Sequence, residues 1–476
     1  MDPLLPAHED GLVTQLGFVI DQRACIGCHA CTVACKAEHG VELGVFRTWV
    51  KYIEHGTFPD AQRSFSVLRC NQCTDAPCVT ACPTTALFKR EDGIVDFDPE
   101  RCIGCKVCMN ACPYDALYID PNQGTAGKCN FCAHRVDAGM QPACEVVCPT
   151  DAIVSGDLDD PASRVSRLLE EVPFEVRAPE QRTGPNVFYL GAAEASIDPL
   201  QVAGGEAYLY SEVVDSQHEK LAPLAEEATA VAMHDVAHPA PWGWRVSSYF
   251  LTKGVAAGAM MLAVGGMLAG LVALAGIAAT GAFLIWDLKR PERFYYLFVR
   301  PQQRSWLALG TWCITAAAAV AFAYTVLGGE ALRWLMVPAG ALLAGYTAFL
   351  FGQCAGRDLW QSRLLLPHTI VNALLAGAAA LALLGEGGLK WWIVGAGAGS
   401  LALIAADTFG RHATRQAARA ARNLWHARRF WWGVALVAAA VPLAPVLAPA
   451  AAVVALVGLW LYEDAWVRAG QSVPLS

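Results

Sequence analysis

Sixteen of the 18 cysteines lie within residues 25–148 and form four groups with related spacing. The first and third groups follow the pattern Cys-x2-Cys-x2-Cys-x3-Cys, while the second and fourth widen the middle gap to four and eleven residues. A proline directly follows the last cysteine of groups two, three and four. The groups are Cys25, Cys28, Cys31 and Cys35; Cys70, Cys73, Cys78 and Cys82; Cys102, Cys105, Cys108 and Cys112; and Cys129, Cys132, Cys144 and Cys148. So dense a set of thiols indicates that bound metal organises this part of the chain.

The spacing favours iron–sulfur clusters over the other common uses of cysteine. Three cysteines in a tight loop can hold three corners of a cubane cluster, and in two-cluster ferredoxins the fourth cysteine ligates the other cluster. A closed zinc site needs four ligands and has no use for a third cysteine two residues after a pair. Disulfide frameworks are typical of small exported domains. Sixteen cysteines at four per cluster predict four [4Fe–4S] clusters.

Short strands are predicted around these loops. The alternating stretch "GIVDF" precedes group three, "ALYID" follows it, and "GFVID" precedes group one. We therefore expect an α+β, ferredoxin-like double dicluster domain over residues 1–192. An acidic segment, residues 193–240, is expected to be a linker.

Charge and hydropathy divide the chain into two unlike halves. Residues 1–240 carry a net charge of −18, and residues 241–476 carry a net charge of +10. Overall, 55% of the residues are hydrophobic, which is too apolar for one ordinary soluble domain. Residues 241–476 are therefore expected to form an all-α polytopic membrane domain, and nothing in the sequence points to nucleic acid.

Apolar runs long enough to cross about 30 Å of hydrocarbon recur through this second half. The first two could be one long helix, but that helix would be about twice the membrane thickness, so a hairpin at Gly265-Gly266 fits better. About eight transmembrane helices are then expected, at residues 246–264, 267–286, 305–327, 332–353, 366–385, 390–407, 430–447 and 449–467.

The loops between these spans suggest an orientation. Fourteen Lys and Arg residues lie on the side of the linker, against Arg333 and Lys390 on the far side. The positive-inside rule then predicts a cytoplasmic iron–sulfur domain on a bacterial or archaeal cell (inner) membrane, and the N-terminus shows no export signal. An alternative is that the basic loops dock the acidic domain.

The cysteine groups, with "KCNFCAHRV" opening the fourth and "TGPNVFYL" after it, resemble the four-cluster electron-transfer subunit of molybdopterin oxidoreductases. The resemblance covers residues 12 to about 192. It implies that group one exchanges its fourth cysteine with group four, and group two with group three. The implied ligand sets are Cys25/Cys28/Cys31/Cys148, Cys129/Cys132/Cys144/Cys35, Cys70/Cys73/Cys78/Cys112 and Cys102/Cys105/Cys108/Cys82. By the same resemblance the first set lies nearest a catalytic partner and the last nearest the membrane.

The second half, with "DLKRPERFYYLFVRPQQRSW" and "YEDAWVRAGQSVPLS", resembles the eight-helix polysulfide-reductase-type membrane anchor. That family implies quinone binding in the first four-helix bundle, at the end facing the iron–sulfur subunit. Polar groups near helix ends in a membrane are candidates for such a site, although Asp287 could simply pair with Arg290. The candidates are Trp242, Trp244, Lys253, Asp287, Tyr346, Gln353 and His368.

These features predict a redox subunit with no catalytic residues of its own. It should carry electrons between a separate molybdopterin (or tungsten) catalytic subunit and the menaquinone or ubiquinone pool of a lipid membrane. No haem is expected, because His368 is the only histidine in or at a predicted span. The alternative is a quinone-coupled ion-pumping module of a larger respiratory complex, which carboxylates deep in several spans would favour.

Overall fold

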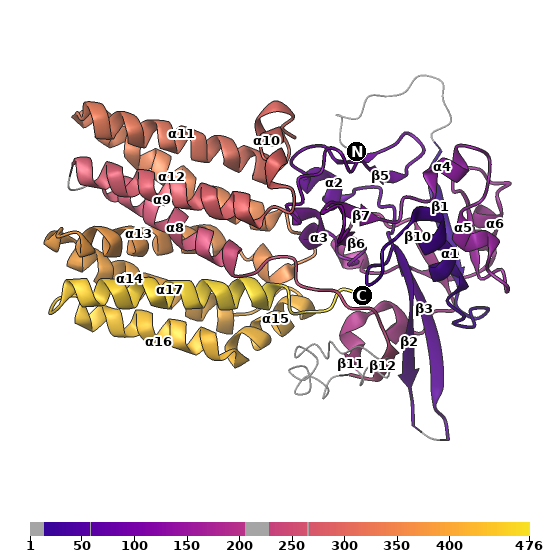
Figure 1. Ribbon diagram of the computed structural model, residues 1–476. Helices are drawn as coiled ribbons and strands as arrows, with labels where there is room; N and C mark the ends of the chain where they lie inside the picture. The colour runs from indigo at the N-terminus through magenta and orange to yellow at the C-terminus, as the bar shows by residue number, and fades with distance from the viewer. Residues whose placement is uncertain (1–13, 58, 205–227, 264–265) are drawn as a thin grey trace.

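The computed structural model describes residues 14–57, 59–204, 228–263 and 266–476. Figure 1 shows a cysteine-rich part built of short strands and helices at one end and a bundle of long helices at the other. The C-terminus lies at the junction between them. This arrangement follows the division of charge and hydropathy along the sequence.

Two four-stranded sheets frame the cysteine-rich part. In the first, β1 (Leu16–Asp21) lies between β8 (Ile153–Asp157) and β10 (Val187–Leu190), and β10 also pairs with β9 (Phe174–Glu175). The parallel pairing of β1 with β10 brings the two ends of this part together. The strand predicted before group one is therefore present as β1.

The second sheet has the order β11-β12-β2-β3, in which β2 (Thr48–His55) and β3 (Gln62–Arg69) form a long hairpin. Its other two strands, β11 (Val202–Gly204) and β12 (Ala230–His234), belong to the segment predicted as a linker. β12 pairs antiparallel with β2. The segment thus adds strands to the cysteine-rich part. Residues 1–240 are called the iron–sulfur half below, and residues 241–476 the membrane half. Residues 205–227 of the predicted linker lie outside the described residues.

Two small hairpins and several short helices carry the cysteines. The hairpins pair β4 (Leu87–Lys89) with β5 (Val95–Phe97) and β6 (Leu117–Ile119) with β7 (Ala126–Lys128). β5 and β6 match the strands predicted on either side of group three. The short helices are α1 (Ala30–His39), α2 (Pro77–Ala81), α3 (Val107–Ala111), α4 (Ala133–Val136), α5 (Ala143–Val146), α6 (Arg164–Glu171) and α7 (Glu194–Ile197).

The second half is helical, and its long helices lie side by side in Figure 1. Among the residues that the structure describes, six of these helices are long and apolar enough to cross a membrane: α9 (Met267–Asp287), α11 (Trp306–Leu327), α12 (Glu330–Gly352), α13 (Leu365–Leu383), α14 (Lys390–Phe409) and α17 (Ala448–Gly470). α8 (Trp244–Leu262), which contains Arg245 and Lys253, and α16 (Arg428–Leu443), which has 16 residues, do not meet that standard. The chain is a multi-pass membrane protein.

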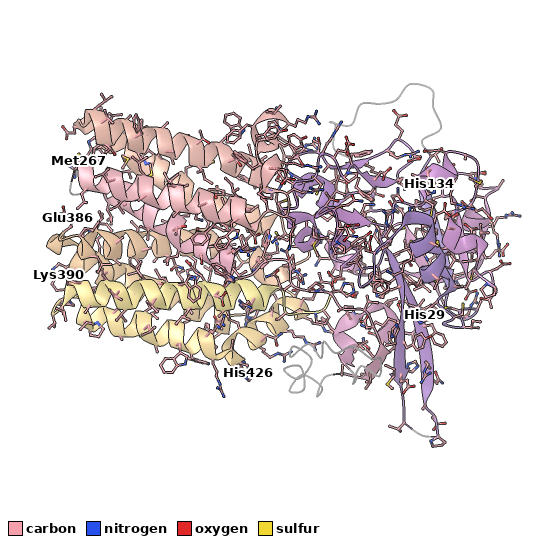
Figure 2. The ribbon with its side chains drawn as sticks, in the orientation of Figure 1. His29, His134, Met267, Glu386, Lys390 and His426 are labelled. Carbon is pink, nitrogen blue, oxygen red and sulfur yellow. The ribbon has the colours of Figure 1, made fainter. Side chains whose placement is uncertain are left out.

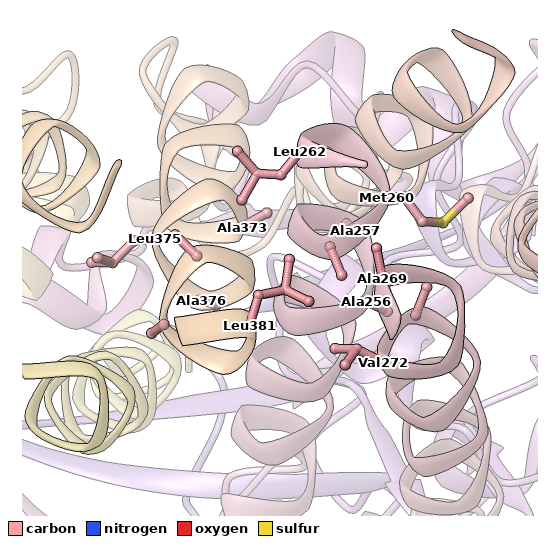
Figure 3. Packing of buried hydrophobic residues seen from close by; sticks show 14 of the residues in the cluster. Ala256, Ala257, Met260, Leu262, Ala269, Val272, Ala373, Leu375, Ala376 and Leu381 are labelled. Atoms are coloured by element: carbon pink, nitrogen blue, oxygen red, sulfur yellow. The ribbon is translucent and has the colours of Figure 1, made fainter. Parts of the chain in front are cut away.

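Small residues allow the helices to approach closely. α8 and α9 are separate antiparallel helices, since Thr252 and Thr280 share a hydrogen bond of 2.9 Å while Gly276 lies against Ala256. Gly265 of the predicted hairpin turn lies outside the described residues. Figure 3 shows alanines of α8 and α13 among the buried side chains packed between the helices. Such small-residue contacts are typical of helix packing in membranes.

Candidate redox centres and membrane cavity

Three cavities in the iron–sulfur half are each surrounded by four cysteines. These cavities belong to three sets of cysteines. In each set, three cysteines come from one sequence group and the fourth comes from another. The sets are Cys82/Cys102/Cys105/Cys108, Cys25/Cys28/Cys31/Cys148 and Cys70/Cys73/Cys78/Cys112.

The remaining four predicted ligands also lie together. Burial raises the pKa of the Cys35 thiol, and the neighbouring thiols of Cys129, Cys144 and Cys132 raise it further. Cys35 ends up beside group four because its helix, α1, packs against α5, which carries Cys144. The chain therefore brings the fourth cysteine of group one to the first three cysteines of group four.

The loops of groups one and three have the same backbone turns. In "CIGCHAC" and "CIGCKVC", Gly27 and His29 match Gly104 and Lys106, and all four residues have φ between 60° and 70°. This left-handed conformation turns the chain sharply between the cysteines, and glycine adopts it at little cost. Repeated turns of this kind aim three sulfur atoms into one cavity.

The chemistry of the thiols fits a positively charged iron centre. Burial raises the pKa of Cys31 to about 11 and the pKa of Cys73 and Cys112 to about 12. Such thiols become thiolates readily only when a metal replaces the proton. Among the described residues, no three His, Cys, Asp or Glu side chains are arranged to hold a single metal ion; three of the four cysteine sets instead surround cavities.

The cavity of Cys82, Cys102, Cys105 and Cys108 lies against the membrane helices. Lys106 and Asp287 form an ion pair of 2.7 Å between α3 and the end of α9. The indole nitrogen of Trp242 donates a hydrogen bond to the carbonyl oxygen of Cys105 at 3.1 Å. Further hydrogen bonds join Ser305 to Ala81, Gln302 to Pro83, Arg293 to Pro99 and Cys102, and Arg357 to Asn110. This side of the iron–sulfur half is thus fixed to the membrane half by many polar contacts.

The tail of the polypeptide completes this junction. Lys51 donates a hydrogen bond of 2.9 Å to the backbone oxygen of Ser476, and Arg177 donates one of 2.6 Å to the carbonyl oxygen of Leu475. Both basic residues are buried. The last residues therefore lie between the two halves.

A cavity lies between α8, α13 and α17 in the membrane half. Lys253 and His368, two of the predicted quinone residues, line it together with Glu463 and Trp466. Lys253 donates hydrogen bonds to the hydroxyl of Thr347 and to a backbone carbonyl of α12. The cavity thus forms where the first helix of the membrane half meets two helices from its later part.

Three buried polar atoms around this cavity have no hydrogen-bond partner among the described residues. They are Nε2 of His368, one carboxylate oxygen (Oε2) of Glu463 and the indole nitrogen (Nε1) of Trp466. Buried polar atoms are rarely left unpaired in proteins. Donors and acceptors from two helices therefore face a site that can accept a polar ligand.

The other predicted quinone residues lie elsewhere or behind the cavity. Tyr346 places its ring 5.3 Å from the amine of Lys253, and Gln353 binds the backbone of the loop before α11. Trp242 contacts Cys105, as described above, and Trp244 meets Trp286 edge-on at 5.4 Å. Asp287 pairs with Lys106, while its expected partner Arg290 binds Glu292 instead. The structure thus brings only Lys253 and His368 of this set into one cavity.

The sequence analysis missed Glu463, Trp466 and Asn372, all of which line the cavity. Glu463 and Asp464 were available as a signal, because two adjacent carboxylates interrupt the apolar run of the last span. Their roles differ: Asp464 is bound by Arg429, Arg468 and Ser247, whereas Glu463 faces the cavity.

Two family models match the sequence. Residues 62–158, which contain cysteine groups two to four, match the 4Fe-4S dicluster domain. Residues 233–332 match the family described as polysulphide reductase, NrfD. The protein therefore joins an iron–sulfur domain to an NrfD-type membrane domain.

Curated relatives resemble part of the protein. A tetrathionate reductase subunit of Salmonella typhimurium is 43% identical over 198 residues, which cover 40% of this sequence and 79% of the relative. A component of polysulfide reductase from Wolinella succinogenes is 38% identical over 190 residues, covering 39% of this sequence and 100% of the relative. The arsenate respiratory reductase iron-sulfur subunit of Shewanella sp. is 37% identical over 227 residues, covering 37% of this sequence and 96% of the relative.

Proposed function

Because this chain belongs to the family of iron–sulfur subunits found in tetrathionate, polysulfide and arsenate reductases, and continues into an NrfD-type domain, we propose that one polypeptide carries electrons between a catalytic oxidoreductase subunit and a membrane quinone. Iron–sulfur electron transfer is the family's function. The quinone, and a molybdopterin or tungsten centre in the catalytic partner, are parts of the proposal.

The four cysteine sets are proposed to hold four [4Fe–4S] clusters, which supply one-electron transfer when bound. The arrangement of three sets around cavities supports this, as does the closeness of Cys35 to Cys129, Cys132 and Cys144. Cys28 is exposed, whereas Cys105 lies beneath Trp242. Electrons would therefore enter or leave near Cys28 on one side and near Cys105 on the other.

The quinone is proposed to bind in the cavity between α8, α13 and α17. The observation that carries this proposal is the set of unpartnered polar atoms on His368, Glu463 and Trp466. A quinone needs a hydrogen-bonding group at each carbonyl, apolar walls and a source of protons. Lys253, His368 and Glu463 can hold or exchange protons, and Phe250 and Leu365 provide apolar walls.

Substitutions in the cavity test this assignment. In His368→Ala and Glu463→Gln membranes, reduction of the clusters by a menaquinol analogue should slow at least tenfold, because each change removes a polar partner of the headgroup. Reduction by dithionite should be unchanged. EPR spectroscopy of the reduced clusters measures both rates. The matched control is Thr315→Val, at an exposed position on α11. Normal menaquinol kinetics in both cavity variants would exclude the cavity as the quinone site.

Quinone-coupled ion pumping remains a second candidate function, favoured by one observation. Glu463 lies within α17 rather than at its end, and its carboxylate faces a cavity that also contains Lys253. A buried carboxylate inside a span is a candidate for a proton relay. Proton uptake by vesicles, measured per quinol oxidised, would support pumping if Glu463→Gln lowered this ratio during the residual quinol oxidation.

The iron–sulfur half is proposed to lie on the cytoplasmic face of the cell membrane. Four basic residues of the near-side loops bind the iron–sulfur half, which supports the alternative that they dock the acidic domain. They are Arg293, Arg357, Arg415 and Arg419. If Arg422, which also takes part in an interaction, is set aside as well, nine of the fourteen basic residues remain, against two on the far side. That excess still favours a cytoplasmic near side.

Cysteine labelling tests the orientation. Glu386 lies at the helix ends far from the iron–sulfur half, and His426 lies at the near ends (Figure 2). With a membrane-impermeant maleimide, Glu386→Cys should react in intact cells, and His426→Cys should react only after permeabilisation. The parent protein provides the background labelling, and the reverse pattern would place the iron–sulfur half outside the cytoplasm.

A further inference from the structure

Two basic side chains are completely buried in the iron–sulfur half. Arg69, at the end of β3, and Lys128, at the end of β7, are both 0% exposed. Neither forms an ion pair with a carboxylate among the described residues. A buried charge is costly unless an opposite charge compensates it, so each side chain needs a source of negative charge nearby.

Arg69 faces the set that contains Cys144. Its Nη1 atom donates a hydrogen bond of 3.2 Å to the sulfur of Cys144, and its guanidinium lies 4.5 Å from the centre of the Phe18 ring. Its Nε and Nη2 atoms have no partner among the described residues. The buried carboxyl of Glu145 accepts hydrogen bonds from Ser155 and Gln141. The charge of Arg69 acts on this carboxyl without forming an ion pair with it, so the sulfur of Cys144 is the anionic group that Arg69 contacts directly.

Lys128 faces a different set. Its amine donates to the carbonyl oxygens of Val95 and Cys129. Val95 lines the cavity of Cys70, Cys73, Cys78 and Cys112. The amine of Lys128 therefore lies beside that set.

The two cations are arranged reciprocally. Arg69 directly precedes Cys70 in the sequence but contacts Cys144 of the other set, and Lys128 directly precedes Cys129 but lies beside the cavity of the Cys70 set. The corresponding residue before group three, Arg101, is partly exposed and pairs with Asp98 at 3.0 Å. Its charge is thus already compensated, unlike the charges of Arg69 and Lys128.

We propose that Arg69 and Lys128 each raise the reduction potential of one cluster. Arg69 acts on the cluster held by Cys35/Cys129/Cys132/Cys144, and Lys128 acts on the cluster held by Cys70/Cys73/Cys78/Cys112. This inference rests on the proposed four-cluster function. Reduction adds a negative charge to a cluster, and a nearby buried cation stabilises that form. The charge acts strongly because the surroundings exclude water.

Charge-neutral variants test the proposal by potentiometry. In the purified full-length protein, Arg69→Met and Lys128→Met should each lower the midpoint potential of one cluster, and the two variants should affect different clusters. The expected shift is at least tenfold in the reduction equilibrium, or about 59 mV for one electron. EPR-monitored redox titration measures each midpoint. Arg69→Lys and Lys128→Arg keep the charge and should restore most of the potential.

Arg101→Met is the matched control, because Arg101 also precedes a cluster cysteine but is exposed and paired with Asp98. The midpoint potentials of the clusters in the Arg101→Met protein should match those of the parent protein. If the Arg69→Met protein assembles without the cluster beside residue 69, the midpoint potential of that cluster is measured in Arg69→Gln instead. The two Lys128 variants test the other cluster independently. Unchanged midpoints in any fully assembled charge-neutral variant would overturn the role of that residue. Zinc, or far fewer than about sixteen irons, in the parent protein would instead overturn the proposed function.

Discussion

Replacing Cys35 with serine is expected to remove about four irons per polypeptide, and to remove them from the proposed cluster of Cys35, Cys129, Cys132 and Cys144. The reason is that Cys35 lies on α1, after the loop that carries the first cysteines of group one, and its thiol is close to the thiols of group four. Serine is a poor substitute for a thiolate ligand. Iron and acid-labile sulfide analysis measures the loss, and EPR spectra of the reduced protein identify the cluster that is missing.

The comparison variants make this result specific. Cys35→Ser should give the same spectrum as Cys132→Ser, and the double variant should lose no further iron. Cys28→Ser should give a different spectrum, because Cys28 lines the cavity of Cys25, Cys31 and Cys148. Cys313→Ser, on α11, is the control and should keep all its iron. A Cys35→Ser spectrum that matched Cys28→Ser would show that group one keeps all four of its cysteines.

Local patterns in the sequence predicted the local structure. The strands beside the cysteine loops and the long helices were predicted because residue alternation and apolar length are properties of neighbouring residues. The number of spans was harder to predict. α8 is a helix where a span was expected, but Arg245 and Lys253 lower its hydropathy, so its membrane character depends on what surrounds it.

Contacts between distant residues could not be predicted in the same way. The pairing of Lys106 with Asp287 joins positions far apart in the sequence, and it replaced the expected local pair with Arg290. The cavity beside Lys253 and His368 depends on Glu463 from the last helix. The segment that contains β12 looks like a linker in the sequence, because the strand that β12 pairs with, β2, lies far upstream. These features require the fold before they can be seen.

Replacing Gly258 with valine should destabilise the membrane half and disrupt the cavity beside Lys253. At this point α8 and α13 touch through their backbones, and a β-carbon on Gly258 would collide with the carbonyl of Ala373 and lie 2.8 Å from the α-carbon of Gly377. The helices must separate to admit a side chain, and overpacking of this kind costs about 3 kcal/mol. For a domain of this size, the melting temperature should fall by roughly 10 °C.

Gly281→Val provides the matched control for this change. Gly281 lies in the neighbouring helix α9, and a β-carbon there would meet nothing within 4 Å, so the same chemical change should alter the melting temperature little. Thermal unfolding of both variants in detergent, with menaquinol-dependent cluster reduction as a second measurement, separates packing from a general effect of valine. Because α8 and α13 both line the cavity, Gly258→Val should also slow menaquinol reduction. Equal melting temperatures for the two variants would mean that the close contact of these helices is not required for stability.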